Sequence, residues 1–182
     1  MGLFDFFKKK EEPAYDPTNL KLTDLRVGFM LDYDMQTWEV QKAFEYDWGN
    51  HYFTYEFQLF NGEEVIYLSV DDNEELALSV SRSVKIRQIQ EDLPDYIVER
   101  ETAPNKLVYK GVMYYLDEDS AGYSKPIGAS DDDWAELINY DYYDETEKKI
   151  LSVSQYGERE FEASAGRVAK GYEFSNIIPG KS

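Results

Sequence analysis

Apolar and polar residues alternate with a period of two along most of the chain from about residue 26 onward. In HYFTYEFQLF (51–60), every second residue is apolar: Phe53, Tyr55, Phe57 and Leu59. Because successive side chains of a strand point to opposite faces, this pattern predicts a strand with one face on a hydrophobic core. The same alternation in the stretches 37–46, 64–70 and 76–80 predicts further strands.

The strand at 51–60 is followed by Asn61-Gly62. This dipeptide favours a two-residue hairpin turn, because a type I′ turn needs positive φ at both central positions. We therefore predict that the first half of the chain, about 26–84, is an antiparallel meander.

The segment 85–105 lacks the alternation and contains Pro94 and Pro104. We predict a connection there with a short helical turn at most. Strand patterns then resume in KLVYKGVMYYLDED (106–119) and INYDYYDETEKKILSV (138–153). Ser130, followed by three aspartates, predicts a capped helical turn, because acidic residues are favourable at a helix N-terminus. The alternative is a turn that leads directly into the strand through Tyr140.

The second half resembles the first. An ungapped shift of 83 residues (151 − 68) lays Leu151-Ser152-Val153 over Leu68-Ser69-Val70, and it also lays Gly111 over Gly28. An internal duplication and a chance likeness between strands are both open at this point.

The predicted fold is thus mainly β, with two related antiparallel meanders that share one core and one or two short helical turns. We predict that residues 1–20 form an amphipathic segment and a polar tether, and that 21–182 form a single β-rich domain. Its halves lie at about 26–84 and 106–178, joined by 85–105.

Charge and composition exclude several classes of protein. The chain has 37 acidic and 19 basic residues, a net charge of −18, which disfavours binding to nucleic acid because that binding depends on Lys and Arg at phosphates. Cysteine is absent, which excludes disulfides and thiol nucleophiles and fits a cytoplasmic protein. No apolar run approaches the roughly 20 residues that a transmembrane helix needs, and a secretory signal is missing.

Catalytic candidates are few. A Ser-His-Asp triad would have to use His51, the only histidine, which follows a turn-like sequence and is predicted to be a surface residue. The acidic stretch from Asp117 begins like a calcium loop but has Ala121 at position five and Gly128 at position twelve. We therefore predict no catalytic, cofactor-binding or metal-binding residues. The alternative is a module that binds a metal or a polyamine, or a hydrolase, through carboxylates on turns.

The order of motifs resembles an uncharacterised bacterial family, domain of unknown function 4178. The motifs are Gly28 in a first strand, Tyr55-Glu56-Phe57, Tyr67-Leu68-Ser69 with Asp71-Asp72, and FEASAGRV with Gly166. The family's usual tryptophan is Tyr67 here. The resemblance implies a bacterial setting, with genes for membrane-stress components, small membrane proteins and polyamine synthesis nearby. It implies no activity and no site residues.

The first ten residues, MGLFDFFKKK, combine apolar residues with three lysines. As a helix this segment is typical of an interfacial anchor, with aromatic rings in the headgroup zone and ammonium groups on anionic lipid. The alternatives are an unpaired terminus or docking on the chain's own domain or on a partner. We predict a non-catalytic bacterial interaction module, cytoplasmic and peripheral to the membrane. Its docking residues are predicted to be Leu3, Phe4, Phe6, Phe7, Lys8, Lys9 and Lys10.

Overall fold

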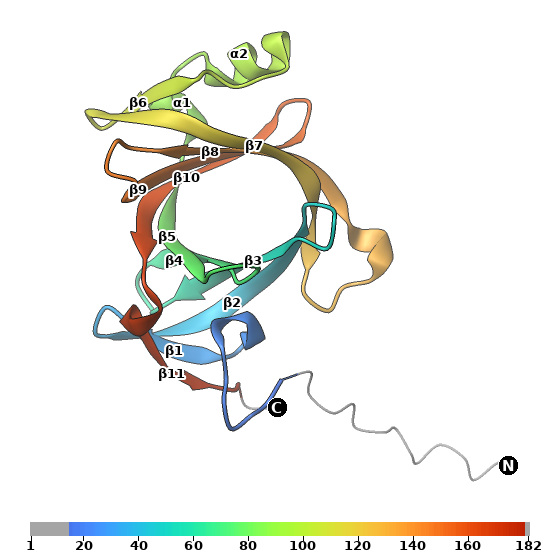
Figure 1. Cartoon of the computed structure of the whole chain (residues 1–182), viewed down its shortest axis with the longest axis vertical. Helices are drawn as coiled ribbons and strands as arrows, with labels where there is room; N and C mark the ends of the chain where they lie inside the picture. The colour runs from blue at the N-terminus through green and yellow to red at the C-terminus, as the bar shows by residue number, and fades with distance from the viewer. Residues whose placement is uncertain (1–14, 181–182) are drawn as a thin grey trace, which may run out of the picture.

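The computed structural model describes residues 15–180, so the predicted docking segment at 3–10 lies outside the described residues. The fold is mainly β, as predicted, and antiparallel throughout (Figure 1). The two α-helices are α1 (Ile86–Ile89) and α2 (Leu93–Arg100). The strands are β1 (Met30–Tyr33), β2 (Gln36–Asp47), β3 (Phe53–Phe60), β4 (Val65–Asp71), β5 (Ala77–Val84), β6 (Lys106–Tyr109), β7 (Val112–Pro126), β8 (Ala135–Tyr143), β9 (Lys149–Gly157), β10 (Glu160–Ala169) and β11 (Phe174–Ile178).

Eight of the strands close into a ring. The hydrogen-bonded order is β11-β1-β2-β3-β4-β5-β10-β9-β8-β7-β6, and β2 also pairs with β7. This additional pairing closes the sheet from β2 round to β7 (Figure 1). The strands β2 and β7, with 12 and 15 residues, are long enough to pair with each other at one end and with an outer hairpin partner at the other. The strands β1, β11 and β6 extend the sheet beyond the ring.

The two halves repeat the same strand plan. In both, a short strand and a long strand are joined by a two-residue turn, and three more strands of a meander follow. The turn residues have positive φ in both halves, Asp34-Met35 in the first and Lys110-Gly111 in the second. The long strands β2 and β7 each carry a bulge, after Val40 and after Leu116. The halves are therefore alike in strand plan and irregularities. Their turns and bulges correspond at a shift of 76 residues (110 − 34 and 116 − 40), so Gly111 matches Met35 and not Gly28, which precedes β1.

The halves meet at two seams, where β5 pairs with β10 and β2 with β7. Each seam contains a glycine on the second-half strand. A Cβ on Gly166 would overlap the carbonyl oxygen of Val80, and a Cβ on Gly122 would lie 2.6 Å from the carbonyl oxygen of Asp47. Only glycine allows the backbones to approach this closely, so these residues set the geometry at which the ring closes.

Hydrophobic side chains form two cores, where one shared core was predicted. The first core includes Trp38, Phe57 and Leu68, and the second includes Tyr142 and Leu151, all of them almost completely buried. The strands alternate between a core face and a face toward the inside of the ring, and the inward face combines serines and carboxylates with aromatic residues such as Phe44 and Tyr46. Each half therefore buries its apolar residues on its own outer side.

The connection at 85–105 contains more helix than predicted. Pro94 lies at the start of α2, where the missing N–H costs nothing because that position has no intrahelical partner. Leu93 and Ile97 are four residues apart on one face of α2 and are buried in the second core. The proline that suggested a break in the chain thus begins a helix.

Two turns show how side chains decide local geometry. The predicted hairpin after β3 exists, but its loop has four residues, because Phe60 pairs with Val65. The side-chain oxygen of Asn61 accepts hydrogen bonds from the N–H groups of Glu63 and Glu64, both at 2.9 Å, and this closes the wider loop. The predicted capped turn is confirmed at Asp131–Asp133, where the Ser130 hydroxyl accepts from the Asp132 N–H at 3.3 Å.

The last strand crosses from one half to the other. Although β11 follows β10 in the chain, it pairs with β1 and places Phe174 in the first core. The ring of Phe174 stacks on Tyr33, with centroids 4.8 Å apart. The C-terminal segment that the sequence assigned to the second half therefore completes the first.

Candidate functional site: the lumen of the ring

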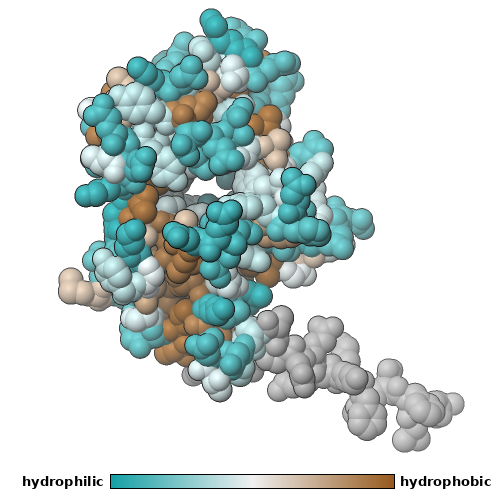
Figure 2. All heavy atoms as spheres, viewed as in Figure 1, coloured by the Kyte–Doolittle hydropathy of each residue, from teal (hydrophilic) through white to brown (hydrophobic). Residues whose placement is uncertain are grey.

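The ring encloses a lumen with a volume of about 1690 Å³. Figure 2 shows an opening at its centre, bordered largely by hydrophilic residues. A closed eight-stranded sheet has an interior that side chains normally fill or that holds one small ligand. Here short side chains leave the space open. Nine serines line it: Ser69, Ser79, Ser81, Ser83, Ser120, Ser124, Ser152, Ser154 and Ser164.

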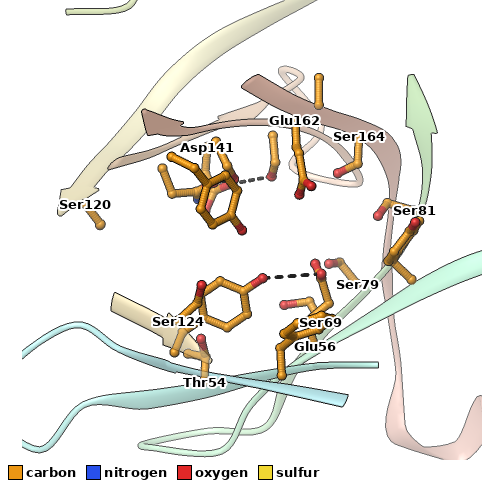
Figure 3. Close-up of a pocket in the computed structure, with 18 of the residues that line it drawn as sticks. Thr54, Glu56, Ser69, Ser79, Ser81, Ser120, Ser124, Asp141, Glu162 and Ser164 are labelled. Carbon is orange, nitrogen blue, oxygen red and sulfur yellow. Dashed lines mark hydrogen bonds between the residues drawn. The ribbon is translucent and has the colours of Figure 1, made fainter. Parts of the chain in front are cut away.

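Three carboxylates point into the lumen from both halves of the chain. Glu56 comes from β3, Asp141 from β8 and Glu162 from β10 (Figure 3). The hydroxyl of Tyr46 donates a hydrogen bond to Oε1 of Glu56 at 3.4 Å, and the hydroxyl of Ser152 donates to Asp141. The strand alternation places Glu56 between Tyr55 and Phe57, so the same pattern that buries the apolar residues turns this carboxylate inward.

The lumen raises the pKa values of its acids. Burial, reinforced by the negative charge of Glu162, raises the pKa of Glu56 to about 7. Burial also raises the pKa of Asp141, although the hydrogen bond from Ser152 partly opposes the effect. The carboxyl of Glu56 therefore exchanges its proton near neutral pH, which is unusual for a glutamate.

Tyrosine hydroxyls complete the polar wall. Burial raises the pKa of Tyr46 and of Tyr156, and in both cases the charges of Glu56 and Glu162 act in the same direction. Burial likewise raises the pKa of Tyr143 to about 12, with a contribution from Asp141. These phenols stay protonated at neutral pH, so they remain available as hydrogen-bond donors and acceptors.

The three carboxylates are not neutralised by basic side chains in the part of the chain that the structure describes. Among residues 15–180, no lysine or arginine forms an ion pair with Glu56, Asp141 or Glu162. The wall also contains basic residues, and those with an ion pair are paired elsewhere. Lys125 lies 2.7 Å from Asp131 and 3.6 Å from Glu45, and both Arg87 and Arg159 pair with Asp95. Lys42 and Lys85 complete the basic residues of the wall. Glu56, Asp141 and Glu162 therefore offer hydrogen-bond acceptors that no basic side chain of the described residues pairs with.

Of the candidates for catalysis or metal binding, His51 does not line the lumen, whereas the stretch that begins at Asp117 contributes Glu118 and Ser120 to its wall. His51 is exposed in the turn before β3, with a φ of 63°, as expected for a surface residue. The stretch that began like a calcium loop runs along β7 and is extended. Asp144 accepts hydrogen bonds from the N–H groups of Lys148 and Lys149 and so stabilises its own turn. Within residues 15–180, no three acidic or histidine side chains are grouped as metal ligands.

The lumen was not predicted from the sequence, although the strands that line it carry a signal for it. The polar positions of two strands are serines: Leu78-Ser79-Val80-Ser81 in β5 and Leu151-Ser152-Val153-Ser154 in β9. In a chain of which 31% is charged, a solvated strand face would carry charged side chains. Small uncharged residues at these positions indicate a face that is polar yet enclosed.

The fold and the lumen define a class of protein: an antiparallel ring of eight strands, built from two similar halves, that encloses an acidic, serine-lined space. Residues 26–171 match the model of the family described as Domain of unknown function (DUF4178), and the chain belongs to this family. Comparison with curated proteins and with solved structures gave no match. Over residues 15–180, no helix combines the length and the apolar character needed to cross a bilayer.

Proposed function

We propose that this protein is a non-catalytic binding module whose ligand site is the lumen, and that its ligand is a linear organic amine. The observation that supports this proposal is the set of three inward carboxylates, Glu56, Asp141 and Glu162, which have no ion-pair partner among the described residues. Carboxylates held in a partly enclosed space bind a cation more strongly than carboxylates in open water.

The chemistry of the wall fits an amine with a polar or short aliphatic chain. Ammonium groups donate up to three hydrogen bonds each, and carboxylates accept them in charge-assisted bonds. The serine hydroxyls, such as those of Ser69 and Ser79 near Glu56, accept further hydrogen bonds (Figure 3). The volume of about 1690 Å³ exceeds the usual size of a small-molecule pocket, so an elongated ligand is favoured over a compact one.

The overall charge supports the same ligand class. A net charge of −18 creates a long-range field that attracts cations and raises their local concentration at the mouths of the lumen. Added salt screens this field over a distance of about 8 Å at physiological ionic strength, so binding is expected to weaken as salt is raised.

The test is calorimetric titration of the full chain with spermidine, for the native protein and for Glu56→Gln and Glu162→Gln. We expect saturable binding that each substitution weakens about tenfold, since each removes one charged acceptor. The matched control is Glu136→Gln, which changes the net charge equally at an exposed position outside the lumen. Equal affinity in all four proteins would mean that spermidine binds the acidic surface and not the lumen.

We also propose that the module acts at the cytoplasmic face of a bacterial membrane. This part of the proposal rests on the sequence of residues 3–10 and on the family resemblance. Co-sedimentation with anionic liposomes tests it, with the full chain compared with a chain that starts at Glu11. Pelleting of the full chain alone, reversed by salt, supports a membrane anchor. The absence of pelleting for both would refute it.

A further inference from the structure

A second hollow lies on the outside of the first half, away from the lumen. It is a groove of about 340 Å³ between the chain segment that precedes β1 and the segment around β11. Its apolar lining is formed by Leu20, Leu22, Leu76, Phe174 and Ile177. Leu22 and Phe174 belong to the first core, so the floor of the groove is continuous with that core.

The groove leaves apolar surface uncovered in the described structure. Leu76 is 49% exposed although it lines the groove, and Tyr172, which follows the lining residue Gly171, is 87% exposed. Figure 2 shows hydrophobic residues gathered on the half of the molecule that carries β1 and β11. Among the apolar residues of the groove, Leu76 is exposed and Leu20 and Ile177 are half-buried. A single exposed apolar residue needs no explanation, but a hollow with an apolar floor is typical of a docking site.

One rim of the groove is acidic. The turn between β4 and β5 contains Asp72, Glu74 and Glu75 immediately before Leu76. Asp72 itself lines the groove, as does one basic residue, Lys21 on the segment before β1. An occupant that fits this surface has apolar side chains for the floor and positive charges for the rim. Residues 3–10 of the same chain have this composition, with apolar residues at 3, 4, 6 and 7 followed by three lysines.

The length of the chain permits this contact. Tyr15 is anchored on the first core, with its ring 5.4 Å from the ring of Phe29, and Leu20 lies only five residues further along. Five residues span at most about 18 Å, so Tyr15 is no further than that from the groove. The eight residue steps from Phe7 to Tyr15 can span up to about 27 Å. This reach exceeds the distance from Tyr15 to the groove, so Phe7 can contact the groove.

We propose that the groove binds residues 3–10 of the same chain, with the aromatic side chains on the apolar floor and the lysines beside the acidic turn. The groove then competes with a membrane surface for the same residues. When the segment is bound in the groove its apolar side chains are buried, and binding to an anionic bilayer releases it from the groove. This contact goes beyond ligand binding in the lumen and does not depend on it.

The chain has no cysteine, so one introduced cysteine reports on a single position. We would measure the rate of maleimide labelling of Leu76→Cys, and separately of Thr23→Cys on the other wall of the groove, in the full chain. Each is compared with the same protein in which Phe4, Phe6 and Phe7 are changed to Ser. Val108→Cys, on β6 and 53% exposed, is the control.

We expect the three serine substitutions to speed labelling at Leu76→Cys and Thr23→Cys at least threefold and to leave the rate at Val108→Cys unchanged. Protection should not vary with protein concentration, because donor and groove belong to one chain. Equal rates in both backgrounds at both groove positions would overturn the proposal. Protection that disappears on dilution would also overturn it, since the occupant would then come from a second copy.

Discussion

Glu56 on β3 and Glu162 on β10 extend toward each other across the lumen, although they belong to opposite halves of the chain (Figure 3). After burial, the charge of Glu162 is the largest cause of the raised pKa of Glu56. Two carboxylates that share an enclosed space resist ionising together. A cation between them removes this repulsion, which links protonation of the lumen to the binding of an amine.

Amine binding should depend on pH near neutrality. Because the pKa of Glu56 is about 7, its carboxylate is mostly protonated at pH 6 and mostly ionised at pH 8. We expect the affinity for spermidine to rise by up to about tenfold between these pH values, as the ionised fraction does. Calorimetry at both pH values should show this rise in the native protein and a weaker dependence in Glu56→Gln. An identical pH profile in the two proteins would contradict a role for Glu56.

Glu56 should also make the fold less stable at high pH. Its pKa rises from 4.5 to about 7 on folding, so between these values the folded state binds more protons than the unfolded state. The free energy of unfolding therefore falls as pH rises through this window. Compared with native protein, Glu56→Gln should be more stable by roughly 1–3 kcal/mol at pH 8 and similar at pH 4.5. Urea denaturation at both pH values measures this. A difference that stays constant with pH would show that the substitution acts through packing.

The seam glycines should be intolerant of a methyl group. In Gly166→Ala the new Cβ meets the backbone of Val80 and Ser81, which cannot move without opening the pairing of β5 with β10. We expect a loss of about 3 kcal/mol or more in the free energy of unfolding. Gly157→Ala is the control, because its Cβ would meet only the side chain of Glu160 at 3.4 Å or more, and it should cost less than about 1 kcal/mol. Thermal unfolding of both variants measures this difference. Equal melting temperatures would disprove the close approach of the β10 backbone at Gly166 to the β5 backbone.

The two cores should respond independently to small cavities. Ile66 lies in the first core and Val153 in the second, and both are completely buried. We expect Ile66→Val to cost about 1 kcal/mol and Val153→Ala about 2 kcal/mol. Because the two residues share no core, the double variant should cost the sum within about 0.5 kcal/mol. Denaturant titrations of the native protein, the two single variants and the double variant complete a double-mutant cycle. A coupling free energy above about 1 kcal/mol between the two sites would indicate one continuous core.

Local patterns predicted much of this fold. The alternation in 51–60 predicts β3, because a strand with one buried face needs apolar residues at every second position. Ser130 predicts its capped turn because the hydroxyl and the following acids are adjacent in the chain. The likeness of Leu68-Ser69-Val70 to Leu151-Ser152-Val153 indicates the equivalence of β4 and β9, since similar local sequences form similar local structures.

Other features depend on contacts between distant segments. Pro94 suggested a break, yet the core that receives Leu93 and Ile97 makes this segment a helix. The pairing of β2 with β7 cannot be read from either strand, because any antiparallel edge offers the same backbone groups. Whether the polar side of a strand faces solvent or a lumen depends on that pairing.

The sequence by itself therefore determined the strands, most of the turns, the acidic character of the chain and its membership of a family, because each of these depends on residue types and their spacing. Only the tertiary structure decided that the sheet closes, that apolar residues form two outer cores and that three carboxylates face the inside of the ring. These outcomes depend on the two seams, where Gly122 and Gly166 allow backbones from different halves to approach. The alternation of apolar and polar residues is the same in an open and in a closed sheet. The side chain of Glu56 faces a lumen only because the sheet closes into a ring.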